Sequence, residues 1–192
     1  MTVPGVVLTG GASRRMGRNK ALILIDGTPL ADRVAATLRR GGCEPVVAIG
    51  GDPELLAPLE VPVFPDRHPG EGPLGGILDG LERWSASDPS VTGWMVAVAC
   101  DLPDLTAGVV RDLTAAGLAA APGSVDVVVA RTDRLEPTVA MWSLSASTAI
   151  SEMYRHGERA LHRVIDGLRH VDVAVDPAAL RNVNTPADLD RR

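Results

Sequence analysis

The chain has 192 residues, a net charge of −5, a hydrophobic content of 45% and an aromatic content of only 3%. This length suits one domain with one core, and the composition requires Val, Leu, Ile and Ala to fill it. The acidic balance and the lack of an apolar run of ~18 residues argue against nucleic-acid and membrane partners. With two cysteines and no export signal, we expect reduced thiols and a cytoplasmic protein.

Short apolar runs of strand length recur along the chain, and glycine or polar residues follow most of them. Such continuous runs are typical of strands that are buried on both faces of a parallel sheet. Strands are therefore expected at residues 6–8, 46–49, 61–64, 94–99 and 125–130.

Amphipathic stretches with helix start signals separate these runs. Thr28 and Thr106 are the expected N-caps of two of the helices. Helices are expected at residues 29–41, 74–84, 107–118 and 147–155, with a short one after Thr185. The alternation predicts a three-layer α/β/α sandwich with a mostly parallel sheet, in a single domain over 1–192. Ligands of such sheets bind beyond the carboxyl ends of the strands.

The first expected strand runs into a segment that is rich in glycine and positive charge, from Gly10 to Lys20. Glycine lets backbone N–H groups approach an anion, Ser13 adds a hydroxyl, and Arg14 is one of four cations in seven residues. Lys20 is the only lysine beside 18 arginines, and its ammonium is a compact point charge, unlike the planar guanidinium. The spacing is not that of a Walker A loop. We interpret the segment as a triphosphate-binding loop, with a solvated turn as the alternative.

Three further segments carry polar groups at expected strand or chain ends. Asp101 follows the most apolar strand and is placed either to hold Mg²⁺ beside phosphates or to cap a turn. Asp66 and the glycines around Gly75 could admit a flat ring or a ribose, or form an ordinary loop. Asn182 and Asn184 share one face of an extended stretch and could bracket a polar ligand edge, or cap a turn.

Taken together, these motifs resemble the molybdenum cofactor guanylyltransferase family, the MobA-type enzymes of the nucleotidyltransferase superfamily. The resemblance covers nearly the whole chain and rests on residues 8–17 with Lys20, 72–76, 100–103, 136–140, 157–159 and 182–186. It implies a Rossmann-like nucleotidyltransferase fold and Mg²⁺-dependent transfer of GMP from GTP to the terminal phosphate of (Mo-)molybdopterin. Pyrophosphate is the second product that the resemblance implies.

The resemblance also implies residue roles, motif by motif. Arg14, Lys20 and Asp101 would be catalytic, with Asp101 as the Mg²⁺ ligand. Asn182 and Asn184 would face the acceptor. The nucleotide would be held by Leu8, Gly10, Gly11, Ser13, Lys20, Asp66, Gly75 and Asp101. GTP and molybdopterin would be the substrates, and molybdoenzymes or cofactor-delivery proteins the further partners.

The chain departs from the family pattern at three places. Thr9 replaces the alanine of the usual Leu-Ala-Gly-Gly, Asn19 stands where aspartate is common, and residues 48–51 lack an asparagine that contacts the base in some members. The choice of guanine over cytosine therefore stays open. The alternatives are a cytidylyltransferase for the same pterin, a guanylyltransferase for another phosphorylated small molecule, and a non-catalytic nucleotide-binding module. The last would lack Lys20 or Asp101, and both are present.

Overall fold

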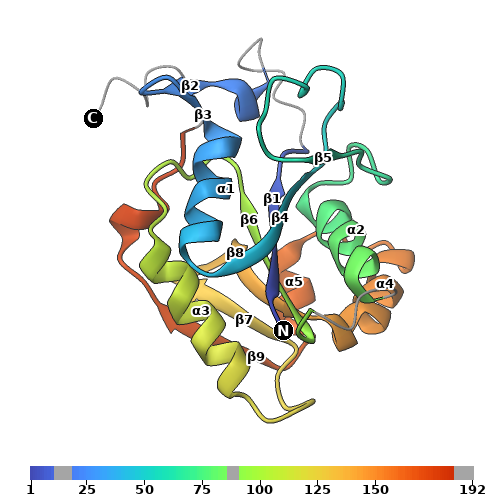
Figure 1. Ribbon diagram of the computed structural model, residues 1–192. Coiled ribbons are helices and arrows are strands. Elements are labelled where there is room, and N and C mark those ends of the chain that lie inside the picture. Colours follow the sequence, from blue (N-terminus) through green and yellow to red (C-terminus); the bar gives the residue numbers. More distant parts are fainter. Residues whose placement is uncertain (11–18, 86–90, 184–192) are drawn as a thin grey trace.

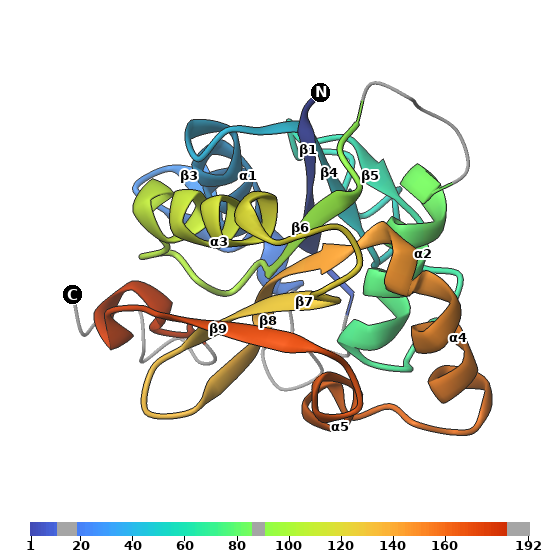
Figure 2. The same ribbon diagram turned by 90° about the horizontal axis from the view of Figure 1, so that it is seen from below.

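The computed structural model describes residues 1–10, 19–85 and 91–183. Its centre is a seven-stranded sheet in the order β5-β4-β1-β6-β8-β7-β9, with helices on both faces (Figures 1 and 2). Neighbouring strands are parallel except on the two sides of β8, so the predicted mostly parallel sandwich is confirmed. The strands are β1 Val3–Leu8, β4 Cys43–Ile49, β5 Val63–Phe64, β6 Trp94–Ala99, β7 Val127–Arg131, β8 Leu135–Ser143 and β9 His170–Ala174.

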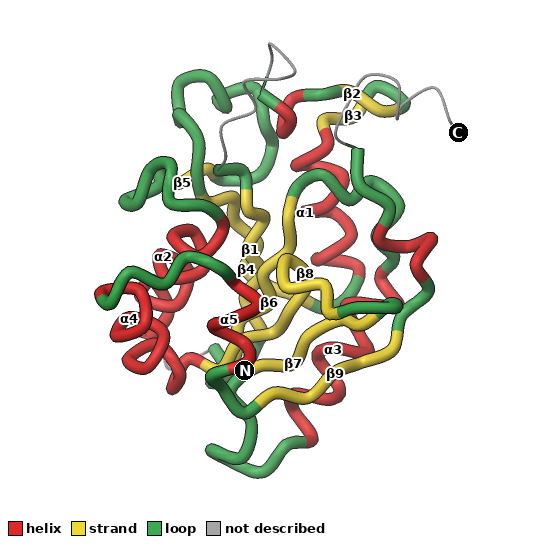
Figure 3. Tube along the Cα trace, turned by 180° about the vertical axis from the view of Figure 1, so that it is seen from behind, coloured by secondary structure: helices red, strands yellow, loops and turns green. Residues whose placement is uncertain are grey.

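The helices form two layers that sandwich the sheet. Helices α1 (Leu30–Arg40) and α3 (Ala107–Ala119) cover one face, and α2 (Pro73–Ser85), α4 (Ser147–Arg155) and α5 (Leu161–Asp166) cover the other (Figures 2 and 3). Among the described helices, none combines the length and the apolar character that crossing a membrane requires. Short 3₁₀ turns are η1 Lys20–Leu22, η2 Leu144–Ala146 and η3 Pro177–Leu180.

The sheet divides the interior into two hydrophobic cores. Successive side chains of a strand point to opposite faces, so Val7 packs toward α1 and α3 while Val6 and Leu8 pack toward α2. Because both faces are covered, the central strands are apolar throughout instead of alternating with polar residues.

The predicted N-cap at Thr28 is wrong. Thr28–Pro29 forms β3, which pairs antiparallel with β2 (Leu24–Ile25) across Asp26 and Gly27. Both turn residues have positive φ, 50° and 79°, the backbone for which Asp-Gly is favoured in hairpins. Pro29 is consequently the N-cap of α1 and makes no side-chain cap.

The other predicted N-cap is confirmed, because Thr106 Oγ1 accepts from the Val109 N–H of α3 at 3.3 Å. The strand predicted at 94–99 and the helix predicted at 147–155 have the predicted bounds, as β6 and α4, and the other predicted elements within the described residues are found with shifted ends. The short helix predicted after Thr185 lies outside the described residues.

The chain order makes the carboxyl end of β1 a topological switch point of the sheet. Strand β4 pairs with one side of β1, and the chain then crosses through β5 and α2 to add β6 on the other side. At such a switch point the loops on the two sides diverge, which leaves room for a ligand. This edge lies at the top of Figure 1, opposite the chain's amino terminus.

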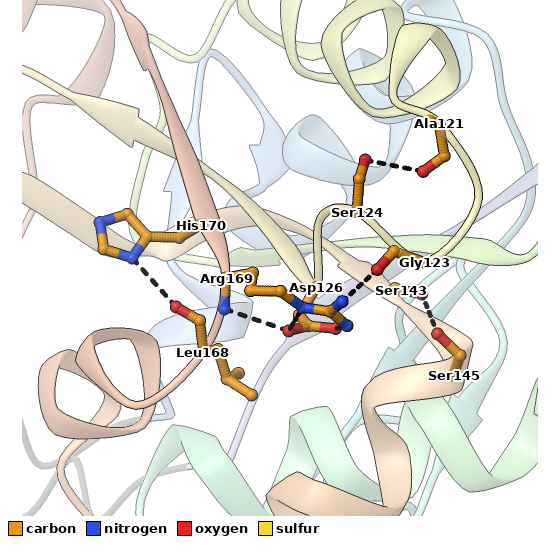
Figure 4. Close-up of polar contacts among 9 residues, drawn as sticks. All are labelled: Ala121, Gly123, Ser124, Asp126, Ser143, Ser145, Leu168, Arg169 and His170. Atoms are coloured by element: carbon orange, nitrogen blue, oxygen red, sulfur yellow. Dashed lines mark hydrogen bonds and ion pairs between the residues drawn. The ribbon is translucent and has the colours of Figure 1, made fainter.

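At the opposite edge of the sheet, the charged residue pair Asp126–Arg169 ties the start of β7 to the start of β9. Asp126 is 7% exposed and accepts from the backbone N–H, Nε and Nη2 of Arg169 at 3.1, 2.8 and 2.6 Å, while Arg169 also donates to the Gly123 carbonyl (Figure 4). The hydrogen bonds from Arg169 lower the pKa of Asp126 below its ordinary value.

Replacing Asp126 with asparagine should lower the free energy of unfolding at pH 7 by about 1–2 kcal/mol, because Arg169 loses a charged acceptor. A depressed native pKa means that this stabilisation is present above the unfolded-state pKa of ~3.9 and is lost as the pH falls through the native value. Denaturation of both proteins at pH 7 and pH 3 is the measurement. The gap between them should shrink at pH 3; an equal gap at both pH values would contradict the assignment.

Candidate functional site

The carboxyl ends of β1 and β4 lie close together at the start of the glycine-rich segment. Thr9 donates from its backbone N–H to Ile49 O at 2.9 Å and from its buried hydroxyl to Gly50 O at 2.8 Å. Gly50 has φ of +105°, and a Cβ there would lie 2.4 Å from the Gly10 nitrogen. Thr9, which replaces the alanine common in the family, thus helps to fix the position of Gly10. The predicted phosphate loop begins at Gly10.

The sole lysine and the predicted metal carboxylate meet, although they are 81 positions apart. Lys20 Nζ donates to Asp101 Oδ2 at 3.2 Å, and the two side chains are 21% and 20% exposed. Asp101 lies two residues after the end of β6. The residue between them, Cys100, donates its N–H to Leu8 O at 3.2 Å. Two strand ends and the η1 turn therefore assemble this pair.

Asn19 has a clear structural role beside Lys20. Its Oδ1 accepts from the Ala21 N–H at 3.1 Å and caps the short 3₁₀ turn that begins at Lys20. Asparagine and aspartate cap helices about equally well, so this departure from the family pattern preserves the local turn.

Asp66 joins the same edge from β5. Its Oδ1 accepts from the His68 N–H at 2.7 Å, and its Oδ2 lies 3.1 Å from where a Cβ would stand on Gly10. Leu8, Gly10, Asp66, Lys20 and Asp101 are thus gathered at the carboxyl ends of neighbouring strands.

Gly75, in the first turn of α2, faces His68. A Cβ on Gly75 would lie 2.7 Å from His68 Cβ, so the missing side chain makes room for that residue. The imidazole of His68 packs edge-on against Tyr154, with ring centroids 4.9 Å apart. A nucleoside contact for Gly75 remains a prediction.

Asp79 of α2 is a buried carboxylate that sequence reasoning missed. It is 5% exposed and accepts from the backbone N–H and the Nε of Arg67 at 2.9 and 2.8 Å. His68 Nδ1 lies 3.3 Å from Asp79 without making a hydrogen bond. The available signal was a charged residue among the apolar residues of a predicted helix, where Leu78 and Leu81 are buried on either side of it.

A group of residues to which the sequence assigned no role links the loop before α2 to the turn between α4 and α5. Arg159 pairs with Glu71, donates to the Tyr154 and Glu158 carbonyls at 2.7 and 2.8 Å, and places its guanidinium carbon 3.8 Å from the Tyr154 ring centroid. The hydrogen bond from Arg159 lowers the pKa of the Glu71 carboxyl. Residues 157–159 of the resemblance therefore lie against the loop that carries Asp66.

The carboxyl-terminal segment reaches the site through Val183. Its N–H donates to Asp101 O at 2.9 Å, and the side chain is fully buried. Asn182, immediately before it, is exposed. Gly11, Ser13, Arg14 and Asn184 lie outside the described residues, so their predicted roles stay predictions.

Comparison with known proteins identifies the family. The model of the MobA-like NTP transferase domain matches residues 5–173. The chain belongs to the MobA-like NTP transferase family. It is 36% identical over 194 residues to the molybdenum cofactor guanylyltransferase of Rhodobacter capsulatus, covering 100% of this chain and 95% of that one. It is 36% identical over 192 residues to that of Acidiphilium cryptum, with coverages of 96% and 91%.

Solved structures agree on the MobA-like fold. Molybdopterin-guanine dinucleotide biosynthesis protein A from Archaeoglobus fulgidus matches with a TM-score of 0.79 at 24% identity, covering 98% of this chain and 96% of that one. Rv0371c of Mycobacterium tuberculosis in complex with manganese matches with a TM-score of 0.72 at 18% identity, covering 100% and 97%. The predicted family, the nucleotidyltransferase fold and the enzyme class are confirmed.

Two groups of this MobA-like enzyme were candidates for metal binding. Asp66, His68 and Asp79 offer ligand atoms within 4.8 Å of one another. The Arg67 guanidinium contacts Asp79 there, just as the Lys20 ammonium contacts Asp101, so a neighbouring positive charge does not distinguish the two groups. Asp101 is the better candidate, because it lies at the predicted phosphate edge and carboxylate oxygen is the ligand type that Mg²⁺ prefers.

The thiols of this MobA-like enzyme do not resemble nucleophiles. Both Cys43 and Cys100 are free and buried, and burial raises the pKa of each to about 12. Since the thiolate is the reactive form, Cys100 is a packing residue despite its place beside Asp101.

Proposed function

We propose that this nucleotidyltransferase transfers GMP from GTP to the terminal phosphate of (Mo-)molybdopterin and releases pyrophosphate. The observation that carries the proposal is the contact of Lys20 with Asp101 at the switch point of the sheet. The names of relatives at 31–36% identity, molybdenum cofactor guanylyltransferases, supply the substrates. We further propose that residues 1–192 act as one domain, since one sheet collects strands from Val3 to Ala174.

The chemistry asks the protein for positioning and charge neutralisation. An oxygen of the acceptor phosphate forms a bond to the α-phosphorus of GTP, and the bond from that phosphorus to the pyrophosphate oxygen breaks. The acceptor is a phosphate monoester and is largely ionised at neutral pH, so no strong general base is required. This agrees with a described site that offers a lysine and carboxylates.

The proposed roles divide the switch-point edge into a nucleotide side and an acceptor side. Lys20 and Arg14 would neutralise the phosphates that Gly10, Gly11 and Ser13 surround, and Asp66, Leu8 and Gly75 would lie toward the nucleoside. Asp101 would hold Mg²⁺, which when bound supplies positive charge beside the phosphates. Asn182 and Asn184 would face the pterin.

The test is incubation of the protein with GTP, Mg²⁺ and molybdopterin. Pyrophosphate release together with molybdopterin guanine dinucleotide is the expected result. The Tm shifts that a panel of nucleotides produces show which base the protein prefers. A larger shift with CTP than with GTP would favour the cytidylyltransferase alternative. Product formation with CTP alone would contradict the guanylyl assignment.

Replacing Asn182 and Asn184 together with alanine should weaken molybdopterin binding or slow its conversion, and change GTP affinity only a few-fold. Side-chain amides match both donors and acceptors on a pterin edge, and each lost hydrogen bond should cost about 0.5–1.5 kcal/mol. Paired titration of GTP and pterin is the measurement. Collapse of GTP binding with intact pterin binding would reverse the assignment of the two sides.

A further inference from the structure

The segment after η3 is tied to the loop that carries Asp101 at two points. The buried Val183 donates its N–H to Asp101 O at 2.9 Å. Two residues earlier, Arg181 donates through Nε to Asp104 Oδ2 at 2.8 Å, and its Nη2 lies 2.7 Å from the same oxygen. Asn182 is therefore the residue between two anchored neighbours.

The rest of this loop is held by contacts that do not involve the carboxyl-terminal segment. Leu105 donates its N–H to Leu102 O at 3.2 Å, and Arg33 of α1 donates to Pro103 O at 3.0 Å. These contacts would hold the loop in place if the Arg181–Asp104 contact were removed. The Arg181–Asp104 contact sets the position of the segment relative to the loop.

We propose that Asp104 and Arg181 are positioning residues that set where Asn182 lies relative to Asp101, and thereby the affinity for the acceptor. A guanidinium fixes direction as well as distance, because it presents two N–H groups in a rigid plane. Without this anchor, the Val183 N–H still holds the segment to Asp101 O, but the direction of Asn182 is less restricted. The inference rests on the proposed function, which places Asn182 on the acceptor side.

The pair stands outside the motifs that define the family resemblance, and its two members are 77 positions apart. The side chains of Arg181 and Asp104 are 35% and 31% exposed, so removing either leaves little buried charge behind. A contact of this exposure is worth up to about 1 kcal/mol, which corresponds to about a fivefold change in affinity.

The experiment is a double-mutant cycle of Arg181→Ala and Asp104→Ala on the full chain. Each single variant should raise the KM for molybdopterin about fivefold, with kcat and the Kd for GTP changed less than about twofold. The double variant should show the same loss as either single one, because one contact is lost in all three. Arg181→Gln keeps most of the side-chain length and repeats the test if the alanine variant folds poorly.

Asp172→Ala is the matched control. Asp172 of β9 pairs with Arg131 of β7 at a similar exposure, 39% and 41%, and β9 carries none of the candidate site residues. This variant should leave the KM for molybdopterin unchanged. A similar rise in the control would show that loss of any surface ion pair affects the acceptor, which overturns the proposal.

The outcomes separate this inference from the proposed function. Suppose that the wild-type protein makes the dinucleotide. The positioning role is then overturned if the single variants keep the wild-type KM for molybdopterin. It is also overturned if the two fivefold losses multiply to about 25-fold in the double variant. If the wild-type protein makes no product, the proposed function has failed, and hydrogen exchange of the Val183 amide decides the positioning role. Faster exchange in Arg181→Ala than in Asp172→Ala supports it, and equal exchange overturns it.

Discussion

Asp101→Asn should remove most of the extra thermal stabilisation that Mg²⁺ adds to GTP binding, and should reduce turnover about 100-fold or more. The amide keeps the shape of the side chain and loses the charge that a hard divalent cation requires. Loss of one well-placed electrostatic group in such a site has an effect of this size. The measurement is the Tm shift produced by GTP with and without Mg²⁺, in the variant and in the wild-type protein.

Asp66→Asn is the matched control for Asp101→Asn, because it makes the same change in another carboxylate at the same sheet edge. GTP should stabilise this variant less, while the increment that Mg²⁺ adds should persist. If Asp101→Asn keeps the wild-type increment, the metal binds elsewhere. The group of Asp66, His68 and Asp79 is then the next candidate.

Lys20→Arg should be nearly as damaging to turnover as Lys20→Ala. The Lys20 side chain is only 21% exposed and places its ammonium 3.2 Å from Asp101 Oδ2, so a wide planar guanidinium has to enter a space that suits a point charge. We expect turnover to fall by about 100-fold in both variants. Steady-state pyrophosphate release at saturating GTP is the measurement.

Asn19→Asp is the control for Lys20→Arg, since it alters the same turn and introduces the residue that is common in the family. Aspartate can accept the hydrogen bond from the Ala21 N–H, so η1 should persist and turnover should stay close to wild type. Near-wild-type turnover in Lys20→Arg would show that the single lysine has no special role in the site.

The parallel half of the sheet was predictable because its signals are local. Short apolar runs, followed by glycine or aspartate, gave β1, β4 and β6 and placed their ends at one edge. The meeting of Lys20 and Asp101 follows from that arrangement. No local pattern links Arg67 to Asp79 or Arg181 to Asp104, because those contacts depend on how loops pack.

Strand β8 was missed for a physical reason. It contains Pro137, which normally counts against a strand interior because proline lacks the backbone N–H. In the structure Val129 pairs with Ala140 and Ala130 with Glu136, so residues 137–139 form an irregularity in the pairing with β7. Strand β9 is the edge strand next to β7. It is largely exposed and contains His170 and Asp172, so no apolar run predicts it.

The sheet separates the support of Asp66 from the support of Asn182. Asp66 belongs to a loop braced by Asp79 of α2, on the face that α2, α4 and α5 cover. Asn182 follows η3, whose Ala179 and Leu180 pack in the core under α1 and α3. Damage to the α2, α4 and α5 layer should therefore appear first as a defect toward the nucleotide. Damage to the α1 and α3 layer should affect both substrates, because its core also holds Ala21 beside Lys20 and Leu102 beside Asp101.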